Sequence, residues 1–402
     1  MNVVALRPPR PDRQSLPATP ARVARIEVFD HMAAAEPYWR ELVLTHAIAT
    51  PYQRYEFLQL WQRHVGAKLG VRPFIVVGFD SVGKPLFLWP FGRRWLGPLR
   101  VVEFLGGKHA NFNVALWRPD VATSVGAGDI RTMLERLAPQ ADALLLINQS
   151  LTWAGTTNPF ALLPHQGAAN FGFSGALAHD FEALLLARSN PVARKKMRKK
   201  QRKLTTYGTV RFERASDDAE VRHVLDAFFK QKSARMRALG VPDAFASAEV
   251  RRFIEAAATE GLAEGAPIIE VYALKVDDII VATMGGIVSD GRFCAMFNSI
   301  AQDRFAAQSP GEQLMLHLVR ACCARGLSTF DLGIGEANYK NLFCSDAEPL
   351  FDSFVALSAA GRPMVFAAGI AAAIKRVVKQ HPQIWWFVRA LRRLRARLSA
   401  AP

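Results

Sequence analysis

The stretch from Ser309 to Phe343 reads SPGEQLMLHLVRACCARGLSTFDLGIGEANYKNLF, and its first half predicts a well-bounded helix. Ser309 precedes Pro310, a residue favoured at the first helical position, and Glu312 completes a capping box with Ser309. The helix is expected to end at Gly326, because glycine readily adopts the left-handed conformation that follows a helix. Free N–H groups at the start of such a helix attract phosphate.

The second half of the same stretch concentrates polar groups around glycines. Asp331 lies in a predicted strand, and Glu336, Tyr339 and Lys340 follow within ten residues. Glycines between them allow the backbone to approach a ligand closely. Two carboxylates, a phenol and an ammonium supply acid, base and charge-binding groups. The alternative is a loop held by a structural ion pair, such as Asp331 with Lys340.

The predicted elements follow the same order in the two halves of the chain. Within the second half, the turn Asp290-Gly291 is a strong signal for a type I′ hairpin. Glycine, asparagine and proline gather over 155–175 and predict a long irregular connection. In the first half we expect strands over 73–79, 86–91, 99–105, 112–116 and 143–147, with helices over 51–66 and 129–137. In the second half we expect strands over 209–214, 268–276, 279–288, 293–300, 329–332 and 351–357, with helices over 218–239, 248–260 and 310–325.

The repeated order predicts an α/β (α+β) protein with two tandem lobes. Each lobe is expected to hold a mixed, mostly antiparallel sheet flanked by helices. The length of 402 residues suits two such units, each with its own core. The predicted divisions are a disordered Pro/Arg-rich tail at 1–25, lobes at 26–185 and 186–362, and a basic amphipathic helical tail at 363–402.

The positive charge is concentrated in two segments. The net charge is +16, and the run from Arg188 to Lys203 carries nine basic residues and no acidic ones. The segment from Pro363 to the end carries eight basic residues and no acidic ones, so the two segments together account for the whole excess. The first run is either a solvated helix linking the lobes or a contact for a polyanion: coenzyme phosphates, an acidic glycan, nucleic acid or anionic lipid. Sequence-specific reading of nucleic acid is not expected, because no recognition motif accompanies it.

The tail from Ile384 to Leu398 interleaves tryptophan and leucine with five arginines. This pattern fits an interfacial helix on an anionic membrane. It also fits a helix packed on the second lobe with an arginine-coated outer face.

Several classes of protein are not supported by the sequence. The longest apolar run near the end, Met364 to Ile374, is shorter than the roughly 20 residues of a membrane span. Residues 1–25 contain five prolines and no apolar core of an export signal. The cysteines show no zinc-binding spacing and are expected to be free thiols, so no metal is assigned and a cytoplasmic location is expected. They are Cys294, Cys322, Cys323 and Cys344.

These motifs together resemble the CelD/BcsL group of GNAT acyltransferases, which is related to the FemAB aminoacyltransferases. The resemblance covers roughly residues 25–360. It rests on the basic helix at Arg194–Lys203, the glycine turn at Ser309–Gly311, and a D-x-G-x-G-x-x-x-Y-K-x-x-F pattern from Asp331 to Phe343. The phosphate loop of simpler GNAT enzymes is not cleanly present, and Glu312 would repel a pyrophosphate.

The resemblance implies transfer of an acyl group, acetyl first of all, from coenzyme A to an amine or hydroxyl. Its link to cellulose-biosynthesis clusters points to polysaccharide or cell-envelope biosynthesis. Glu336 or Asp331 would act as the base, Tyr339 would protonate the leaving thiolate, and Lys340 would hold an anionic part of a substrate. Backbone N–H groups near Phe297–Ser299, where two strands are expected to splay apart, would stabilise the oxyanion. The expected donor-binding residues are Asn298, Ser299, Ser309 and Gly311.

Two alternatives remain open at this point. One is a non-catalytic scaffold with the same fold at the inner membrane. The other is a FemAB-like transferase that uses aminoacyl-tRNA, against which the second half shows no long inserted helical hairpin. The acceptor is not identified by any motif; a sugar, a lipid-linked compound or an amino compound would each fit. Peripheral contact with an anionic inner membrane would be compatible with all three functions.

Overall fold

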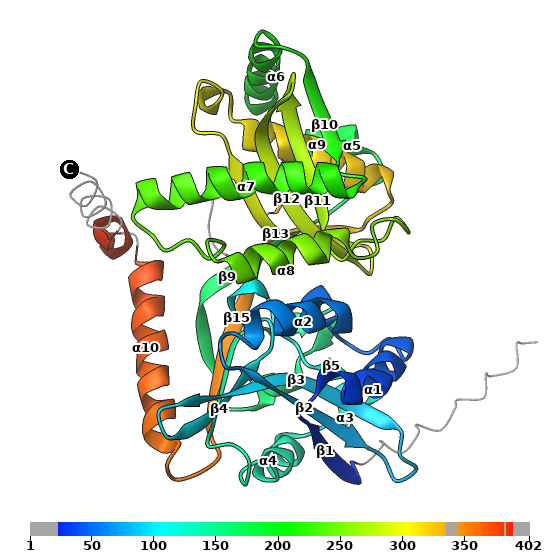
Figure 1. Ribbon diagram of the computed structural model, residues 1–402, viewed down its shortest axis with the longest axis vertical. Helices are drawn as coiled ribbons and strands as arrows, with labels where there is room; N and C mark the ends of the chain where they lie inside the picture. Colours follow the sequence, from blue (N-terminus) through cyan, green and yellow to red (C-terminus); the bar gives the residue numbers. More distant parts are fainter. Residues whose placement is uncertain (1–22, 335–341, 345, 382, 389–402) are drawn as a thin grey trace, which may run out of the picture.

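The computed structural model describes residues 23–334, 342–344, 346–381 and 383–388. It confirms the expected fold class: one large mixed sheet runs through the molecule, and helices flank it on both faces (Figure 1). All but the last three residues of the expected disordered tail, 1–25, lie outside the described residues.

Most of the predicted elements are present, and the structure adds the strand Arg25–Phe29 and the helix Met32–Leu44, which the sequence analysis did not predict. The strands are β1 Arg25–Phe29, β2 Arg72–Phe79, β3 Pro85–Leu96, β4 Leu99–Phe104, β5 Leu116–Trp117, β6 Ala143–Ser150, β7 Thr152–Trp153, β8 Thr156–Thr157, β9 Gln166–Ala176, β10 Val210–Arg214, β11 Glu270–Val276, β12 Ile279–Ser289, β13 Arg292–Ile300, β14 Thr329–Ile334 and β15 Asp346–Ala356. The α-helices are α1 Met32–Leu44, α2 Tyr55–Trp61, α3 Pro119–Ser124, α4 Ala127–Glu135, α5 Phe181–Arg188, α6 Pro191–Thr205, α7 Asp218–Leu239, α8 Ala248–Thr259, α9 Pro310–Ala324 and α10 Arg362–Gln380.

The pattern of parallel and antiparallel pairing is the same from either end of the sheet. It runs β1-β2-β3-β4-β6-β15-β9-β14-β13-β12-β11-β10. Four antiparallel strands at each end are followed by one parallel pair, β4 with β6 in the first half and β13 with β14 in the second. Within each parallel pair, a helical crossover connects one strand to the next, as parallel strands require. The sheet therefore carries the predicted duplication in its topology.

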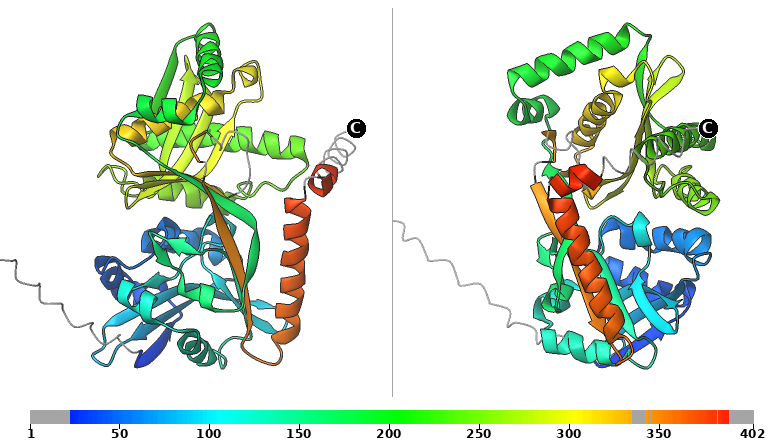
Figure 2. Two further views of the ribbon diagram at one scale, coloured as in Figure 1. Left: turned by 180° about the vertical axis from the view of Figure 1, so that it is seen from behind. Right: turned by 90° about the vertical axis from the view of Figure 1, so that its left-hand side faces the viewer.

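Strands β9 and β15 occupy the centre of the sheet and cross between its halves. β9 comes from the first half of the chain but pairs with β14, whereas β15 comes from the end of the chain and pairs with β6. The two strands also pair with each other and run together between the lower and upper lobes in Figure 2. The expected lobes, 26–185 and 186–362, stay a prediction, and the exchange means that each half of the sheet uses a strand from the other half of the chain.

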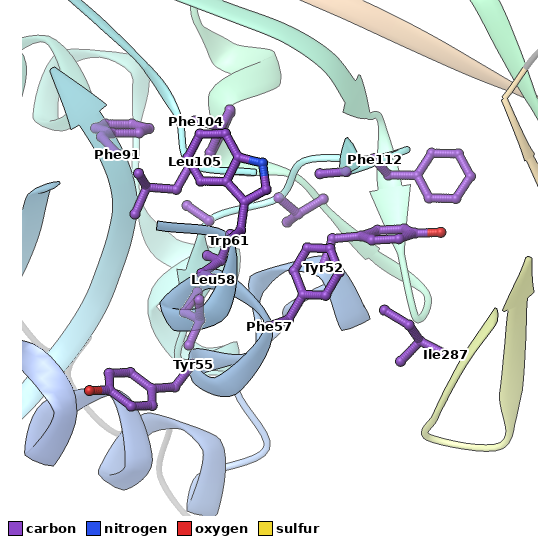
Figure 3. Close-up of a cluster of buried hydrophobic side chains, with 14 of the residues drawn as sticks. Tyr52, Tyr55, Phe57, Leu58, Trp61, Phe91, Phe104, Leu105, Phe112 and Ile287 are labelled. Atoms are coloured by element: carbon purple, nitrogen blue, oxygen red, sulfur yellow. The ribbon is translucent and has the colours of Figure 1, made fainter. Parts of the chain in front are cut away.

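Helices cover both faces of the second half, and the hydrophobic core continues across the junction. α7 and α9 both contact β11, β12 and β13, and they lie on opposite sides of these strands (Figures 1 and 2). Ile287 of β12 belongs to the same buried cluster as Tyr52 and Phe57 from the first half, as Figure 3 shows. Contacts of this kind fix the two halves against each other.

Local sequence explains some elements and misleads for others. Asp290 and Gly291 both have positive φ, 50° and 72°, which confirms the predicted tight hairpin between β12 and β13. The strand expected over 112–116 is wrong, because the segment forms only the short strand β5, Leu116–Trp117, and an isolated bridge from Asn113 to Gln149. The irregular connection expected over 155–175 is also corrected, since it contains most of the long strand β9.

α10 lies along the middle of the sheet, against β9, β15 and β6 (Figure 1). Within the residues that the structure describes, no helix combines the length and the apolar character needed to cross a membrane.

Candidate active site

The parallel pair of the second half opens partway along its length. β13 pairs with β14 only from Arg292 to Cys294, opposite Thr329 to Asp331. Beyond that point β13 stays with β12 as far as Ile300, whereas β14 stays with β9, with which it pairs from Thr329 to Ile334. The strands therefore separate shortly before Phe297–Ser299, where the sequence predicted a splay.

A buried ion network lies at the closed end of this opening. Asp331 is 0% exposed, and its Oδ2 accepts hydrogen bonds from Arg292 Nε at 2.9 Å and Nη2 at 2.7 Å. The same Nη2 donates to Glu348 Oε1 at 2.9 Å, and Ser174 also donates to that carboxylate. The guanidinium of Arg292 lies over the ring of Trp153, 4.4 Å from its centroid. The network thus joins β13, β14, β9 and β15.

This geometry bears on the role expected for Asp331. Its other oxygen, Oδ1, accepts the backbone N–H of Gly333 at 2.6 Å. Burial raises the pKa of this carboxyl, and the Arg292 guanidinium acts in the opposite direction. Proton abstraction by Asp331 would require the Arg292 contact to break, so the arrangement suits a charge that holds the strands in place. The partner of Asp331 is Arg292, a residue that the sequence reasoning did not single out.

The first half of the chain reaches into the same region. Asn111 Nδ2 donates to the backbone oxygen of Ala295 on β13 and to the hydroxyl oxygen of Tyr52, both at 2.9 Å. Gly333 has a φ of +67°, and an added Cβ would lie 2.4 Å from Asn111 Nδ2. A side chain at this glycine would therefore clash with Asn111, which explains why the motif needs glycine here.

The start of α9 differs from the predicted capping box, and it shows how the charge of Glu312 is balanced. Ser309 has a left-handed backbone, with φ 51° and ψ 58°, and its side chain makes no capping hydrogen bond. An N-cap needs an extended backbone, so the predicted capping box is wrong. Instead, Lys200 Nζ donates to Ser309 Oγ at 2.8 Å and to Glu312 Oε2 at 2.7 Å. Lys200 thereby neutralises Glu312, the carboxylate expected to repel a pyrophosphate.

The four expected donor-binding residues gather where β13 ends and α9 begins. Gly311 lies so close to β13 that an added Cβ would be 2.8 Å from Ile300 Cγ2. The hydroxyl of Ser299 donates to Gln231 Oε1 at 2.7 Å and also contacts Thr283 Oγ1. Its side chain is therefore engaged by α7 and β12.

The remaining donor-binding candidate, Asn298, contacts Lys232, which is the second residue of this site that the sequence did not identify. Its backbone oxygen accepts from Lys232 Nζ of α7 at 3.2 Å. Burial lowers the pKa of Lys232, as does the nearby positive charge of Arg235. In the sequence Lys232 is one of several charged residues of a long amphipathic helix, and nothing distinguishes it from them.

Three of the expected catalytic residues are not placed. Glu336, Tyr339 and Lys340 lie outside the described residues. Asp331 marks one end of the opened pair, beside Cys294, and the donor-binding candidates mark the other end, beside Ile300. Among the described residues there is no group of three or more His, Cys, Asp or Glu side chains that could hold a metal ion.

A cavity of about 300 Å³ lies beside α9, between α5 and α6. Arg194, Arg198 and Arg320 supply positive charge to its wall, and Phe181 and Leu316 supply apolar surface. Arg320 is paired with Glu182, 2.6 Å away. The basic run that the sequence singled out therefore forms α6, and it contributes both to this cavity and to the start of α9.

Comparison with known proteins shows that this region is similar to a described domain family. Residues 192–341 match the family model of the acetyltransferase (GNAT) domain. That segment contains α9, both opened strands and all the residues expected to take part in catalysis or donor binding. No curated protein matches the chain. The expected relation to GNAT enzymes is thus confirmed for this segment, and the relation to the CelD/BcsL group stays a prediction.

Solved structures extend the likeness of the fold to most of the chain. A structure titled FemX is 8% identical with a TM-score of 0.54, over 85% of this chain and 99% of that one. The C-terminal domain of a protein described as a lysylphosphatidylglycerol synthetase, from Agrobacterium fabrum, is 12% identical with a TM-score of 0.50, over 87% and 97%. A tandem GNAT protein from the clavulanic acid pathway is 10% identical with a TM-score of 0.45, over 83% and 99%.

Proposed function

We propose that this protein is an acyltransferase that moves an acyl group, which we take to be acetyl, from a coenzyme A thioester to an amine or hydroxyl acceptor. The observation that carries the proposal is the opened pair β13–β14 with the start of α9 at its open end, all within the segment that matches the GNAT domain. An opening of this kind exposes backbone groups of β13 that a continuous sheet would use for pairing. We assign the pathway to polysaccharide or cell-envelope biosynthesis.

The donor is proposed to lie with its phosphates toward α9 and its thioester toward the opening. The helix start favours negative charge, and Lys200 removes the repulsion that Glu312 alone would exert. Arg194 and Arg198 add positive charge along the neighbouring cavity. The residues present therefore fit a phosphate-bearing ligand, with Asn298 and Ser299 on the strand that leads toward the thioester.

In the proposed reaction, the acceptor nitrogen or oxygen attacks the thioester carbonyl carbon. Backbone N–H groups between Phe297 and Ser299 stabilise the oxyanion, the C–S bond breaks, and coenzyme A leaves as a thiolate. Glu336 takes the proton of the acceptor, and Tyr339 gives a proton to the sulfur. Lys340 holds an anionic part of either substrate. Asp331, fixed by Arg292, keeps the motif that follows it in position.

We place the enzyme in the cytoplasm, with peripheral contact to the inner membrane through residues 383–402. Of that segment the structure describes Gln383 to Val388, which are helical. Trp386 and Phe387 are exposed, so neither is buried against the second lobe.

The decisive measurement is release of free coenzyme A thiol from acetyl-CoA by the full-length protein, with amino sugars and lipid-linked sugars as acceptors. Calorimetric titration with coenzyme A measures donor binding independently of the acceptor. We expect saturable binding. If neither acetyl-CoA nor coenzyme A binds at millimolar concentration, the proposal is wrong, and transfer from aminoacyl-tRNA under the same conditions would establish the tRNA-dependent alternative.

The role of Glu336 has its own test. Glu336→Gln should lower kcat by roughly 10²–10⁴-fold with unchanged donor affinity, because only the proton transfer is lost. Glu264→Gln, an exposed carboxylate in the loop after α8, is the matched control and should keep full activity. Full activity of the Glu336 variant would remove this residue from the mechanism.

A further inference from the structure

α10 has an unusual position for a long helix of a globular protein. None of its residues, Arg362–Gln380, all of which the structure describes, is fully buried. An amphipathic helix normally turns its apolar side toward the core. α10 lies along β9, β15 and β6, yet several of its contacts with them are polar (Figures 1 and 2).

The side of α10 that faces the sheet carries basic residues. Lys379 Nζ donates to Asn170 Oδ1 at 2.6 Å, and Arg376 Nη1 donates to the backbone oxygen of Gly167 at 3.3 Å. Both partners lie on β9. These hydrogen bonds orient the helix about its own axis, because the residues that make them occupy one side of it.

Four large apolar side chains of α10 lie on its outward side. They are between 45 and 71% exposed and recur every three or four residues, which places them on one face. We call this face the outer stripe, and it consists of Phe366, Ile370, Ile374 and Val377. The outer stripe is continuous over about three helical turns.

Charge selects the occupant of this surface. α10 itself contains four basic residues, Arg362, Lys375, Arg376 and Lys379, and no acidic ones. A second copy of the chain would bring two such segments together, and like charges repel. A bilayer with anionic lipid instead offers negative charge for the basic residues and an apolar layer for the outer stripe.

We propose that α10 is a membrane-docking helix that lies in the plane of an anionic lipid surface, with the outer stripe inserted below the headgroups. This surface is distinct from residues 383–402, and it does not depend on the acyl-transfer reaction. The sheet beneath α10 holds the helix in position, so docking needs no folding step at the membrane.

The test is sedimentation of the full-length protein with vesicles of phosphatidylcholine alone and of phosphatidylcholine mixed with phosphatidylglycerol. The stripe variant combines Phe366→Gln, Ile370→Gln and Ile374→Gln, because glutamine keeps a high helix propensity. The control variant combines Leu44→Gln, Leu69→Gln and Val82→Gln, apolar residues elsewhere on the surface that are 62–81% exposed.

We expect the wild-type and control proteins to bind mixed vesicles at low salt and the stripe variant to partition at least about tenfold more weakly, given the apolar area removed. Binding should weaken in 0.5 M NaCl (about five times the ionic strength at which the screening length is about 10 Å), because salt screens the attraction of basic residues. A chain truncated after residue 388 should bind less well but keep the difference between the two variants. Circular dichroism and thermal unfolding establish that both variants fold.

Two results would overturn the proposal. The first is equal partitioning of the stripe and control variants onto mixed vesicles. The second is that the wild-type protein does not bind vesicles but forms a dimer in light scattering, whereas the stripe variant is monomeric. That outcome would assign the outer stripe to a second copy of the chain, and neither result depends on whether coenzyme A is the donor.

Discussion

The two halves of the sheet share a pattern of strand pairing, but the side chains at their parallel pairs differ in polarity. In the first half, the parallel pair joins apolar residues, Val101 opposite Ala143 and Val102 opposite Leu144, all buried. In the second half the corresponding pair brings Cys294 opposite Asp331, and Arg292 completes an ion network. Such a difference in one topology indicates that the first half acts as a packed support and the second half carries the polar site.

The aromatic packing of the first half strengthens this contrast. Phe87 and Trp89 stack with ring centroids 4.6 Å apart, and Phe160 lies 5.1 Å from Trp89. Trp117 joins the same group, 5.8 Å from Phe160. All four rings are fully buried. The parallel pair of the first half is itself short, with two registered residue pairs against three in the second half, so the halves differ in the side chains around the pair and not in whether its strands separate.

The largest expected effect comes from breaking the ion network. Arg292→Met should lower the free energy of unfolding by about 3–5 kcal/mol, because it leaves Asp331 buried without its cation. Arg94→Met in the first half is the control. Its pair with Glu103 is partly exposed and should be worth about 0–1 kcal/mol. Urea unfolding of both variants measures the difference, and similar losses from the two would show that the halves are not chemically distinct.

An effect of nearly the same size is expected from the aromatic core of the first half. Phe160→Ala should cost about 3–5 kcal/mol of unfolding free energy. Trp95→Ala, an exposed aromatic residue in the same half, should change it by within about 0.5 kcal/mol. Donor affinity of the folded Phe160 variant should match the wild-type protein. A specific loss of donor binding would show that the first half contributes directly to the site.

The junction of the halves contains a histidine whose protonation should control stability. His109 accepts a hydrogen bond from Trp61 Nε1 at 3.1 Å and lies 3.4 Å from the backbone oxygen of Ala244. Burial lowers its pKa to about 4. The unfolded chain binds a proton near pH 6.5 and the folded chain does not, so stability falls as pH decreases from about 6.5 toward 4.

Protonation of His109 should lower the free energy of unfolding by about 3 kcal/mol between pH 6.5 and pH 4. His109→Asn keeps an acceptor for Trp61 but cannot titrate, so its unfolding free energy should depend less on pH than that of the wild-type protein. Urea unfolding at pH 7.5 and at pH 5 compares the two proteins. Parallel pH profiles would mean that the junction does not hold His109 in its neutral form.

The smallest expected effect refines the role of the charged half. Lys200→Gln leaves Glu312 unpaired at the start of α9 and should raise the KM for acetyl-CoA by about tenfold. The double variant with Glu312→Gln should recover most of that loss, because the repelling carboxylate is gone. Lys196→Gln, an exposed residue of the same helix, is the control. If the double variant binds donor as poorly as the single variant, Lys200 contacts the donor directly.

Sequence alone predicted elements with strong local patterns. The helix that became α9, the hairpin at Asp290-Gly291 and the basic helix α6 were all expected close to their observed bounds. β9 was missed because its sequence, QGAANFGFSGA, is rich in glycine and alanine and has weak strand propensity. It forms a strand because β14 and β15 pair with it on both sides, which no local window contains.

The candidate site shows the same limit. Asp331 was expected at a strand end, but the structure places it in the middle of β14, at the last residue pair that β14 forms with β13. Its partner Arg292 is 39 residues away in sequence, and the contact of Lys200 with Ser309 spans 109 residues. Ser309 was expected to cap its helix on local grounds, but this distant lysine takes its hydroxyl. Single-sequence patterns identify groups with chemistry, whereas their pairing depends on tertiary structure.

The exchange of β9 and β15 has a consequence for how the chain is made. A ribosome delivers the first half early, but β6 lacks its neighbour β15 until residue 356 has emerged, and β9 must wait for β14. Domains usually fold one after the other during synthesis. Here the nascent first half keeps an unpaired strand edge, a surface prone to aggregation, from the synthesis of Ser150 to that of Ala356, about half of translation. Neither half is therefore expected to fold when it is expressed alone. A chaperone that covers the exposed strand edge until β15 is synthesised should increase the yield of folded protein.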